Sequence, residues 1–413
     1  MKSFAILAAT VVAVPSFAAE ADWPEFRGGT GQGISAAERV PLTWSATENV
    51  AWKVAVPGKG WSSPVVAAGK VYLTAATTDS EPGAALHALC FDAKDGRLLW
   101  DTGIFRSSAA ASSAMHGKNS LASPTPIATA DRLFVHFGHM GTAALDLAGK
   151  VIWKQVSLAY EPVHGNGGSP ALVGGLLVFS CDAAKDPFIA ALDAKSGEVR
   201  WKTPRDTPAK KQFSFSTPLA SGSGDTTIII SPGSGLVGGY DLRTGKEKWR
   251  VTYGEGYSVV PRPVIANGMV FVSSSFDKPV VKAIRLEAAS GDVSESHVAW
   301  TLGKGGPHTA SMLLSGGDLF FISDAGIVTC ANATTGDVRW TERLPGNYSA
   351  SPVVAEGRIY FLNETGTTSV IKAGEKFEVL ATNAIGEATL SSPAVIDGAV
   401  LLRSEGHLWR FGK

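Results

Sequence analysis

The sequence predicts an all-β fold, an eight-bladed β-propeller with four antiparallel strands in each blade. Three observations lead to this prediction: a tryptophan recurs every 40 to 53 residues, a tight-turn motif precedes it, and a Ser-Pro step or a variant of it opens each apolar hairpin. Of the 413 residues, 45% are hydrophobic and 18% are charged, with 46 glycines. This composition supplies a sizeable core and excludes a disordered chain.

Charge and cysteine content exclude several classes of protein. The 37 lysines and arginines balance the 37 aspartates and glutamates, so no net charge draws the protein to nucleic acid or to an anionic membrane. The three cysteines, Cys90, Cys181 and Cys330, lie far apart without CxxC spacing. This pattern argues against a disulfide-rich scaffold and against a zinc site.

Residues 1–18 are predicted to be a cleaved signal peptide. Lys2 supplies the positive charge, Phe4 to Val14 form a nearly apolar run, and small residues precede a cut after Ala18. The apolar run is about half the length that spans a bilayer, and no cysteine follows it to accept a lipid anchor. We therefore expect a periplasmic or secreted protein without a transmembrane segment.

Residues 19–48 are predicted to form an N-terminal arm, and residues 49–413 the propeller. The best copy of the repeat runs from Ala191 to Trp201 and is predicted to be strand, tight turn and strand. Asp193 caps the turn, Gly197 takes its positive φ, and the tryptophan packs on the outgoing strand. The repeat tryptophans are Trp52, Trp100, Trp153, Trp201, Trp249, Trp300 and Trp340.

A second signature, a Ser-Pro step or a variant of it, marks the start of each unit. A proline at the first residue of a strand costs no ladder hydrogen bond, and the hairpin that follows adds two strands to those of the turn motif. The seventh unit is degenerate, with Leu380 in the tryptophan place. The signature occurs at Ser63-Pro64, Ser123-Pro124, Ser169-Pro170, Thr217-Pro218, Arg262-Pro263, Ala310-Ser311, Ser351-Pro352 and Ser392-Pro393, which predicts eight units.

The two ends of the repeat region indicate how the array closes. The last unit ends after its third strand, at Leu408 to Arg410, while Val50 to Val54 has the character of an extra outer strand. Pairing these two segments removes both sheet edges and closes a ring. An open solenoid is the competing arrangement.

The repeat and the arm together resemble a known family. The AxDxxxGxxxW repeat, preceded by Asp22-Trp23-Pro24-Glu25-Phe26-Arg27-Gly28, resembles bacterial pyrroloquinoline-quinone-like (PQQ-like) β-propeller repeat proteins over residues 22–413. These include quinoprotein dehydrogenases and the propeller lipoproteins of outer-membrane assembly. The resemblance implies a quinoprotein-like propeller. In the dehydrogenases it also implies a quinone, held by a tryptophan and a disulfide of adjacent cysteines, with Ca²⁺ beside it.

The cysteines bear on the cofactor that the resemblance implies. No two cysteines are adjacent in this chain. We therefore expect no cofactor, with PQQ and calcium as the alternative.

Departures from the repeat predict the ligand face. The loops that enter the inner strands and those between the second and third strands lie on one face of a propeller. Polar residues that break the repeat in these loops are therefore candidates for binding. The predicted ligand-binding set is His116, Asn119, His136, His139, His164, Asn166, Tyr257, Arg262 and His308.

These residue types leave three function classes open. Histidine ligates metals, moves protons and binds hydroxyl or carboxylate groups, and Arg262 with Tyr257 adds a carboxylate clamp and a proton donor. His136 and His139 have a spacing at which both imidazoles reach one metal. The preferred class is a binding module for a small molecule, a glycan or an envelope protein. The alternatives are an enzyme for carbohydrate-type substrates and a PQQ- and calcium-dependent dehydrogenase. We expect a monomer.

Overall fold

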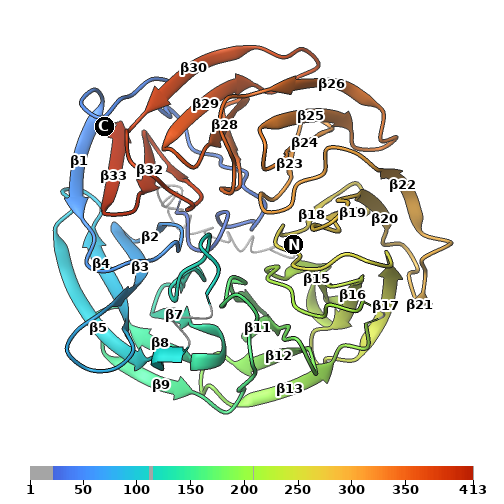
Figure 1. Cartoon of the computed structure of the whole chain (residues 1–413), viewed down its shortest axis with the longest axis horizontal. Helices are drawn as coiled ribbons and strands as arrows, with labels where there is room; N and C mark the ends of the chain where they lie inside the picture. The colour runs from blue at the N-terminus through green and yellow to red at the C-terminus, as the bar shows by residue number, and fades with distance from the viewer. Residues whose placement is uncertain (1–21, 111–114, 208, 413) are drawn as a thin grey trace, which may run out of the picture.

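The protein is an eight-bladed β-propeller, as the sequence predicts. The computed structural model describes residues 22–110, 115–207 and 209–412, and the predicted signal peptide lies outside these ranges. Eight separate sheets surround a central axis, each built on four antiparallel strands (Figure 1). In blades one to seven the chain runs from an inner strand at the axis to an outer strand at the rim.

The first four blades follow the arm in chain order. Blade one is β2 (Val65–Ala67), β3 (Lys70–Thr77), β4 (Ala85–Asp92) and β5 (Leu98–Arg106). Blade two is β6 (Ile127–Ala128), β7 (Arg132–His136), β8 (Thr142–Asp146) and β9 (Val151–Gln155), with the 3₁₀ turn η1 (Gly138–Met140). Blade three is β10 (Ala171–Val173), β11 (Leu176–Cys181), β12 (Phe188–Asp193) and β13 (Val199–Pro204). Blade four is β14 (Leu219–Ser221), β15 (Ile228–Gly233), β16 (Leu236–Asp241) and β17 (Glu247–Thr252), with η2 (Gly224–Thr226).

The remaining blades complete the ring. Blade five is β18 (Val264–Ala266), β19 (Met269–Ser273), β20 (Val281–Arg285) and β22 (Val298–Leu302), and its excursion β21 (Gly291–Asp292) pairs in parallel with β17. Blade six is β23 (Leu313–Ser315), β24 (Asp318–Ile322), β25 (Ile327–Asn332) and β26 (Val338–Arg343). Blade seven is β27 (Val353–Ala355), β28 (Arg358–Leu362), β29 (Thr367–Lys372) and β30 (Val379–Ala384). Blade eight is β31 (Ala394–Ile396), β32 (Ala399–Arg403), β33 (His407–Gly412) and β1 (Val50–Ala55).

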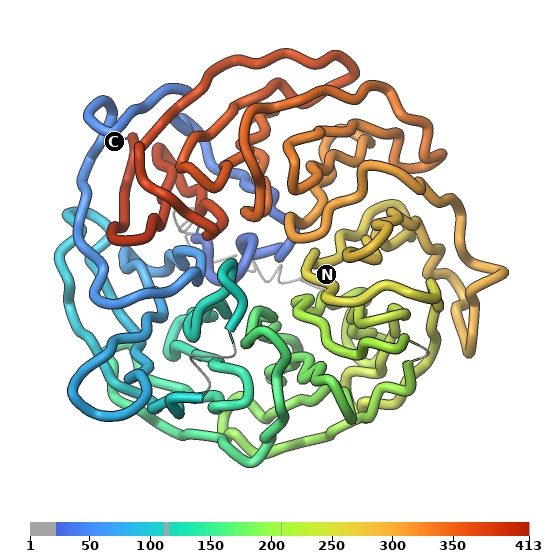
Figure 2. The backbone as a smooth tube through the Cα atoms, in the orientation of Figure 1, coloured from blue at the N-terminus to red at the C-terminus, as the bar shows by residue number. Residues whose placement is uncertain are grey.

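The predicted closure of the ring is confirmed. Strand β1 pairs antiparallel with β33, with Lys53 opposite Trp409 and Val54 opposite Leu408. Figure 2 shows the two ends of the repeat region side by side. The last blade therefore has a fourth strand from the N-terminal side, which removes the edges that an open solenoid would expose.

The repeat tryptophan connects neighbouring blades. A Cβ at Gly197, in the turn of blade three, would lie 2.6 Å from the ring of Trp153 in blade two. The Trp153 indole N–H donates to the carbonyl of Ala194 in the same turn, at 3.2 Å. The glycine is therefore required for its positive φ and for the close approach of the indole. The same donation across a blade interface is made by Trp52, Trp100, Trp201, Trp300 and Trp340.

In blade seven, the residue at the tryptophan position of the repeat is not the predicted one. The register places Ala381 opposite Val370, the position that Trp340 occupies opposite Cys330 in blade six. The prediction of Leu380 at this place was wrong by one residue, because the turn before β30 differs in length. Trp44 of the arm stacks on Tyr360 of blade seven at 6.2 Å and on Phe411 of blade eight at 5.3 Å. An arm residue thus supplies the aromatic packing between these two blades.

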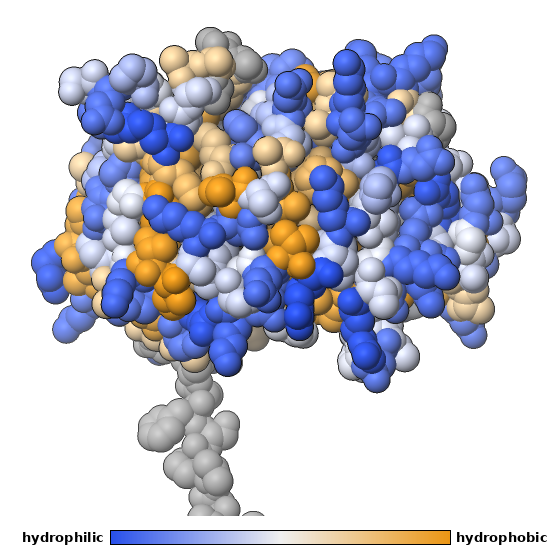
Figure 3. Space-filling model, turned by 90° about the horizontal axis from the view of Figure 1, so that it is seen from below, coloured by the Kyte–Doolittle hydropathy of each residue, from blue (hydrophilic) through white to orange (hydrophobic). Residues whose placement is uncertain are grey.

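Apolar side chains fill the interfaces between blades, and the cysteines belong to them. Cys90, Cys181 and Cys330 are all buried and free. Burial raises the pKa of the Cys90 thiol to about 12, so this thiol is protonated at neutral pH. The rim is mixed: the side seen edge-on in Figure 3 carries hydrophilic and hydrophobic side chains, and the exposed Ile152 and Val199 lie on its outer strands β9 and β13.

The N-terminal arm crosses one end of the channel. Trp23 forms an antiparallel bridge with Val66 in blade one, and Ile34 forms a parallel bridge with Val354 in blade seven. Both partners, Val66 and Val354, belong to inner strands. The arm therefore crosses the central axis before it turns outward towards β1 (Figure 1). This end of the channel is therefore closed by the arm.

Candidate functional site

A cavity of about 320 Å³ lies in the channel where the inner strands begin. Each of the eight blades contributes at least one lining residue, from Trp61 in blade one to Ser392 in blade eight. Phe26 of the arm also lines it. Since the arm crosses the other end of the channel, Phe26 forms the floor and the cavity is blind.

A ring of hydroxyl groups forms the lower wall. We call it the hydroxyl belt: Ser63, Thr125, Ser169, Thr217, Ser311, Ser351 and Ser392. Each member stands directly before the first residues of an inner strand, and its hydroxyl oxygen accepts an amide N–H from the preceding blade. Ser63 N donates to Thr125 Oγ1 at 2.9 Å, and Ser392 N donates to Ser63 Oγ at 3.2 Å, across the point where the ring closes. In blade two the belt residue is Thr125, two residues after the predicted Ser123-Pro124 step.

Arg262 occupies the eighth belt position but does not line the cavity. Its side chain is 2% exposed and turns towards the arm. The Nη1 group donates to Phe26 O at 2.6 Å, Nη2 lies 3.3 Å from Glu25 Oε1, and Nε donates to Pro218 O at 3.2 Å. Burial raises the pKa of Glu25 although Arg262 opposes this shift. Arg262 therefore anchors the floor of the cavity.

A second arginine is buried beside Arg262. Arg27 donates from Nη2 to Met312 O at 2.6 Å and to Gln32 O at 2.8 Å. Within the described part of the chain, its Nε and Nη1 have no hydrogen-bond partner. Burial and the nearby charge of Arg262 lower the pKa of Arg27 to about 9, so the guanidinium is still cationic at neutral pH.

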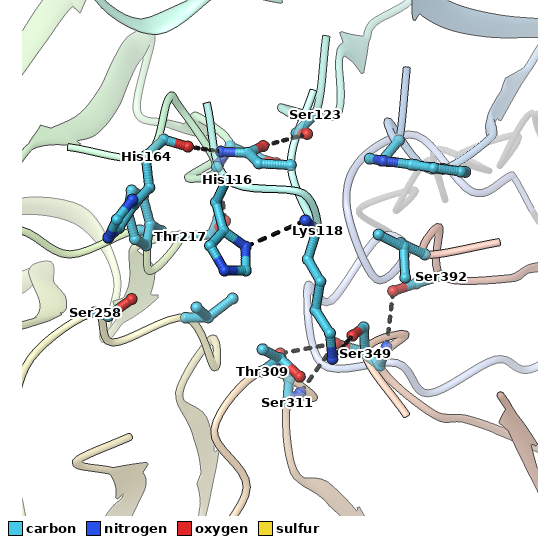
Figure 4. A pocket seen from close by; sticks show the side chains of 18 of the residues that line it. His116, Lys118, Ser123, His164, Thr217, Ser258, Thr309, Ser311, Ser349 and Ser392 are labelled. Carbon is cyan, nitrogen blue, oxygen red and sulfur yellow. Dashed lines mark hydrogen bonds between the residues drawn. The ribbon is translucent and has the colours of Figure 1, made fainter. Parts of the chain in front are cut away.

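Aromatic rings form an arc around the upper part of the channel. We call it the aromatic collar: His116, His164, Phe213, Tyr257, Phe276 and His308, from blades two to six. Successive ring centroids are separated by 5.5, 5.3, 5.5, 6.1 and 4.9 Å in that order. Figure 4 shows His116 and His164 beside Thr217, a threonine of the hydroxyl belt.

Two lining residues hold strained backbone conformations. His164 has φ of 65° and Ser258 has φ of 54°, in the left-handed region that non-glycine residues seldom adopt. The Asn119 side-chain amide donates to His164 O at 2.9 Å and helps to hold this loop. Such strain is concentrated at ligand-binding and active sites of proteins.

Lys118 is the charged side chain of the cavity lining. It reaches from blade two across the mouth towards Ser349 of blade seven (Figure 4). There its Nζ lies 2.7 Å from Glu364 Oε1 of blade seven and 4.0 Å from Asp324 of blade six. Both carboxylates are partly exposed, with side-chain exposures of 21% and 23%. The described lining contains no carboxylate.

The structure brings only part of the predicted set to the cavity. His116, Asn119, His164 and Tyr257 line it, and His308 contacts it through the ring of Phe276. His136, His139 and Asn166 lie to one side, where Asn166 donates to Phe137 O at 3.1 Å. Sequence reasoning left Lys118 and the hydroxyl belt out of the set, although seven hydroxyl residues at equivalent places in the repeat were a usable signal.

His136 is a buried residue of a blade. It ends strand β7, and its Nδ1 lies 2.8 Å from Thr142 Oγ1 while its ring packs at 4.3 Å on Phe179. Among the residues that the structure describes, no group of three or more His, Cys, Asp or Glu side chains is placed to hold a metal ion.

The burial of His136 predicts acid sensitivity. Burial lowers the pKa of His136 to about 3, and His139 acts in the same direction; the unfolded value is about 6.5. Between these values only the unfolded chain binds the proton, so the stability from neutral His136 is complete above about pH 6.5 and lost as the pH falls towards 3. The free energy of unfolding of the wild type should therefore fall between pH 7 and pH 4.5. In a double variant, His136→Phe with Thr142→Val, we expect this fall to be smaller by about 2 kcal/mol.

Urea unfolding at both pH values measures this difference. His297→Phe, at a partly exposed histidine, is the control and should titrate like the wild type. Equal losses in the double variant and the wild type would contradict the assignment to His136.

Comparisons with known proteins agree with the architecture. The family model described as outer membrane protein assembly factor BamB matches residues 41–182 and 292–375, more than half of the chain. Among curated proteins, the lanthanide-dependent methanol dehydrogenase of Methylorubrum extorquens is 26% identical over 193 residues, which is 41% of this chain and 28% of that protein. The match thus spans less than a third of the length of that dehydrogenase.

Solved structures share the fold at low sequence identity. BamB from Moraxella catarrhalis has a TM-score of 0.62 at 13% identity, covering 88% of this chain and 99% of the other. A europium-containing methanol dehydrogenase has a TM-score of 0.71 at 10% identity, covering 95% of this chain and 98% of the other. In the described part of this chain no helix is long and apolar enough to cross a membrane.

The residues of the cavity do not match those that a quinone and a cation require. The described lining contains no carboxylate, whereas Ca²⁺ prefers carboxylate and carbonyl oxygens. The cysteines are buried and apart, so the adjacent-cysteine disulfide that the resemblance implies has no counterpart. The fold and the family model nevertheless assign the chain: it belongs to the PQQ-like β-propeller family whose model is described as outer membrane protein assembly factor BamB.

Proposed function

We propose that this protein is an exported binding module that holds a small organic ligand in the blind cavity at the channel mouth, without quinone. The cavity itself is the main support for this proposal, because all eight blades contribute to its lining and the arm closes its floor. Here the lining is polar and aromatic, the combination that small-molecule sites use for orientation and contact area.

The collar supports a binding role. The left-handed backbone at His164 and Ser258 costs of order 1–3 kcal/mol each, and the rest of the fold must stabilise these loops. Holding histidine and serine in such loops places their side chains at the cavity.

The two histidines that line the cavity, His116 and His164, favour binding over catalysis. A catalytic histidine is normally oriented by a third group, commonly a carboxylate. Neither His116 nor His164 contacts a carboxylate within the described residues, and the Nδ1 of His116 accepts the backbone N–H of Lys118 at 3.2 Å. Arg262, which the sequence analysis named with Tyr257 as a carboxylate clamp and proton donor, instead donates to Phe26 O of the arm.

Ligand binding through the collar is testable by thermal shift. We expect at least one compound in a library of sugars, carboxylates, amino acids and nucleosides to raise the melting temperature of the wild type by several degrees. At a hundred times its Kd a ligand adds about 2.7 kcal/mol to stability. The variant His164→Asn with Tyr257→Ala should fold and lose the shift, because it removes two collar rings while asparagine tolerates positive φ.

The control is Ile152→Ala on the outer strand β9, which should respond like the wild type. A wild type that responds to no compound, or a shift that survives loss of the two collar rings, would overturn the proposed function.

A further inference from the structure

We propose that the ligand is an acidic sugar, a six-membered sugar ring with a carboxylate, either free or at the end of an oligosaccharide. This inference rests on the proposed function and names the ligand class of the same cavity. Three features of the site lead to it: unpaired hydroxyl donors in the belt, excess positive charge buried around the floor, and the aromatic collar at the mouth.

The belt offers hydrogen-bond donors that the described protein does not use. Each belt hydroxyl oxygen already accepts a backbone N–H, as in Thr125 to Ser169 at 2.9 Å and Ser169 to Thr217 at 3.0 Å. Ser351 donates its own proton to Ser311 at 3.0 Å. No acceptor within the described residues takes the protons of the other six, which belong to Ser63, Thr125, Ser169, Thr217, Ser311 and Ser392.

These six hydroxyl groups are buried and line the cavity. A buried polar group without its partner costs free energy, so the cavity is suited to a ligand rich in acceptor oxygens. Carboxylate, hydroxyl and ring oxygens of a sugar are such acceptors, and a carboxylate accepts hydrogen bonds more strongly than a neutral oxygen.

Positive charge is in excess below and behind the belt. Arg262 is paired with Glu25, but among the described residues Arg27 beside it donates only to backbone carbonyls, and Arg262 repels it. A third buried guanidinium, Arg403, donates to Ser62 Oγ at 2.7 Å, next to belt residue Ser63. These buried charges are weakly screened, unlike the partly exposed Lys118–Glu364 pair at the mouth. An anionic group is therefore attracted to the lower cavity, near Phe26.

The aromatic collar favours a ligand that contains a sugar ring. Aromatic faces pack on the apolar C–H face of a sugar ring while its hydroxyl groups remain free to form hydrogen bonds. The cavity volume of about 320 Å³ is at the small end of the roughly 300–1,000 Å³ that is usual for ligand sites. Because Phe26 closes the floor, a longer chain can enter only with its end, so the site would bind a terminal sugar.

The test is calorimetric titration of the wild type with galacturonate, glucuronate, mannuronate and trigalacturonate. Galactose is the neutral match, galactonate the acyclic match with a single carboxylate, and PQQ a carboxylate-bearing polycycle of another class. We expect at least one uronate, free or in the trimer, to bind tenfold or more tightly than galactose and galactonate, with an affinity that falls as salt is raised from 50 to 500 mM. The trimer distinguishes an oligosaccharide end from a free sugar acid. Tyr257→Ala should weaken uronate binding tenfold or more, and Ile152→Ala should not change it.

Each other outcome has a definite meaning. Equal binding of galactose overturns the acidic class, equal binding of galactonate overturns the ring, and binding of PQQ alone points to the quinone. A library compound of another class that needs the collar overturns the sugar but leaves the proposed function standing. If no compound binds at all, the proposed function fails as well.

Discussion

Deleting residues 49–55 is expected to yield a protein that aggregates or is rapidly cleaved by protease. These residues include β1, the fourth strand of blade eight, and their loss exposes the edge of β33. It also removes Trp52, which is 8% exposed and donates to Ala93 O of blade one at 3.1 Å. Blade eight would then lack its outer ladder, and its interface with blade one would lack the indole contact.

A single substitution tests the same interface without shortening the chain. Trp52→Ala should lower the free energy of unfolding by about 3–5 kcal/mol, the usual cost of truncating a buried tryptophan. Urea denaturation measures this loss. Leu98→Ala, at an exposed position of the outer strand of blade one, is the control and should be close to neutral. A deletion variant that melts like the parent would show that closure of the ring does not depend on this strand.

Arg262→Met is expected to cost about 3–5 kcal/mol, because it leaves the carboxyl group of Glu25 buried without its charged partner. The same change removes the donor to Phe26 O and loosens the floor of the cavity. Thermal unfolding gives the stability, and limited proteolysis reports whether residues 22–33 detach. The sequence placed Arg262 in the predicted ligand-binding set, whereas in the structure its side chain is buried against the arm.

Two further variants separate the ion pair from simple packing. Adding Glu25→Gln to Arg262→Met should restore part of the stability, since the unpaired buried charge is gone. Arg106→Met removes an exposed arginine paired with Asp79 and should barely change the melting temperature. If Arg262→Met proved as mild as Arg106→Met, the arm would not depend on this anchor.

The sequence by itself determined the blade count, the four strands and the closure. Each follows from local rules that act over a few residues: turn residues with positive φ, proline at strand starts and alternation of apolar side chains. The family followed as well, because the repeat spacing is a property of the chain alone. Even the error at Leu380 was confined to one residue of a degenerate turn.

Only the tertiary structure decided which departures from the repeat face the ligand cavity. His136 and His116 are both polar interruptions near strand ends, yet His136 ends a strand with its side chain packed on Phe179 of the next blade, while His116 lines the channel. Arg262 occupies a belt position but turns to an arm more than 200 residues away in the sequence. The direction of a side chain depends on which neighbour fills the adjacent space. In a closed ring that neighbour comes from another blade or from the arm, at a separation that no local pattern encodes.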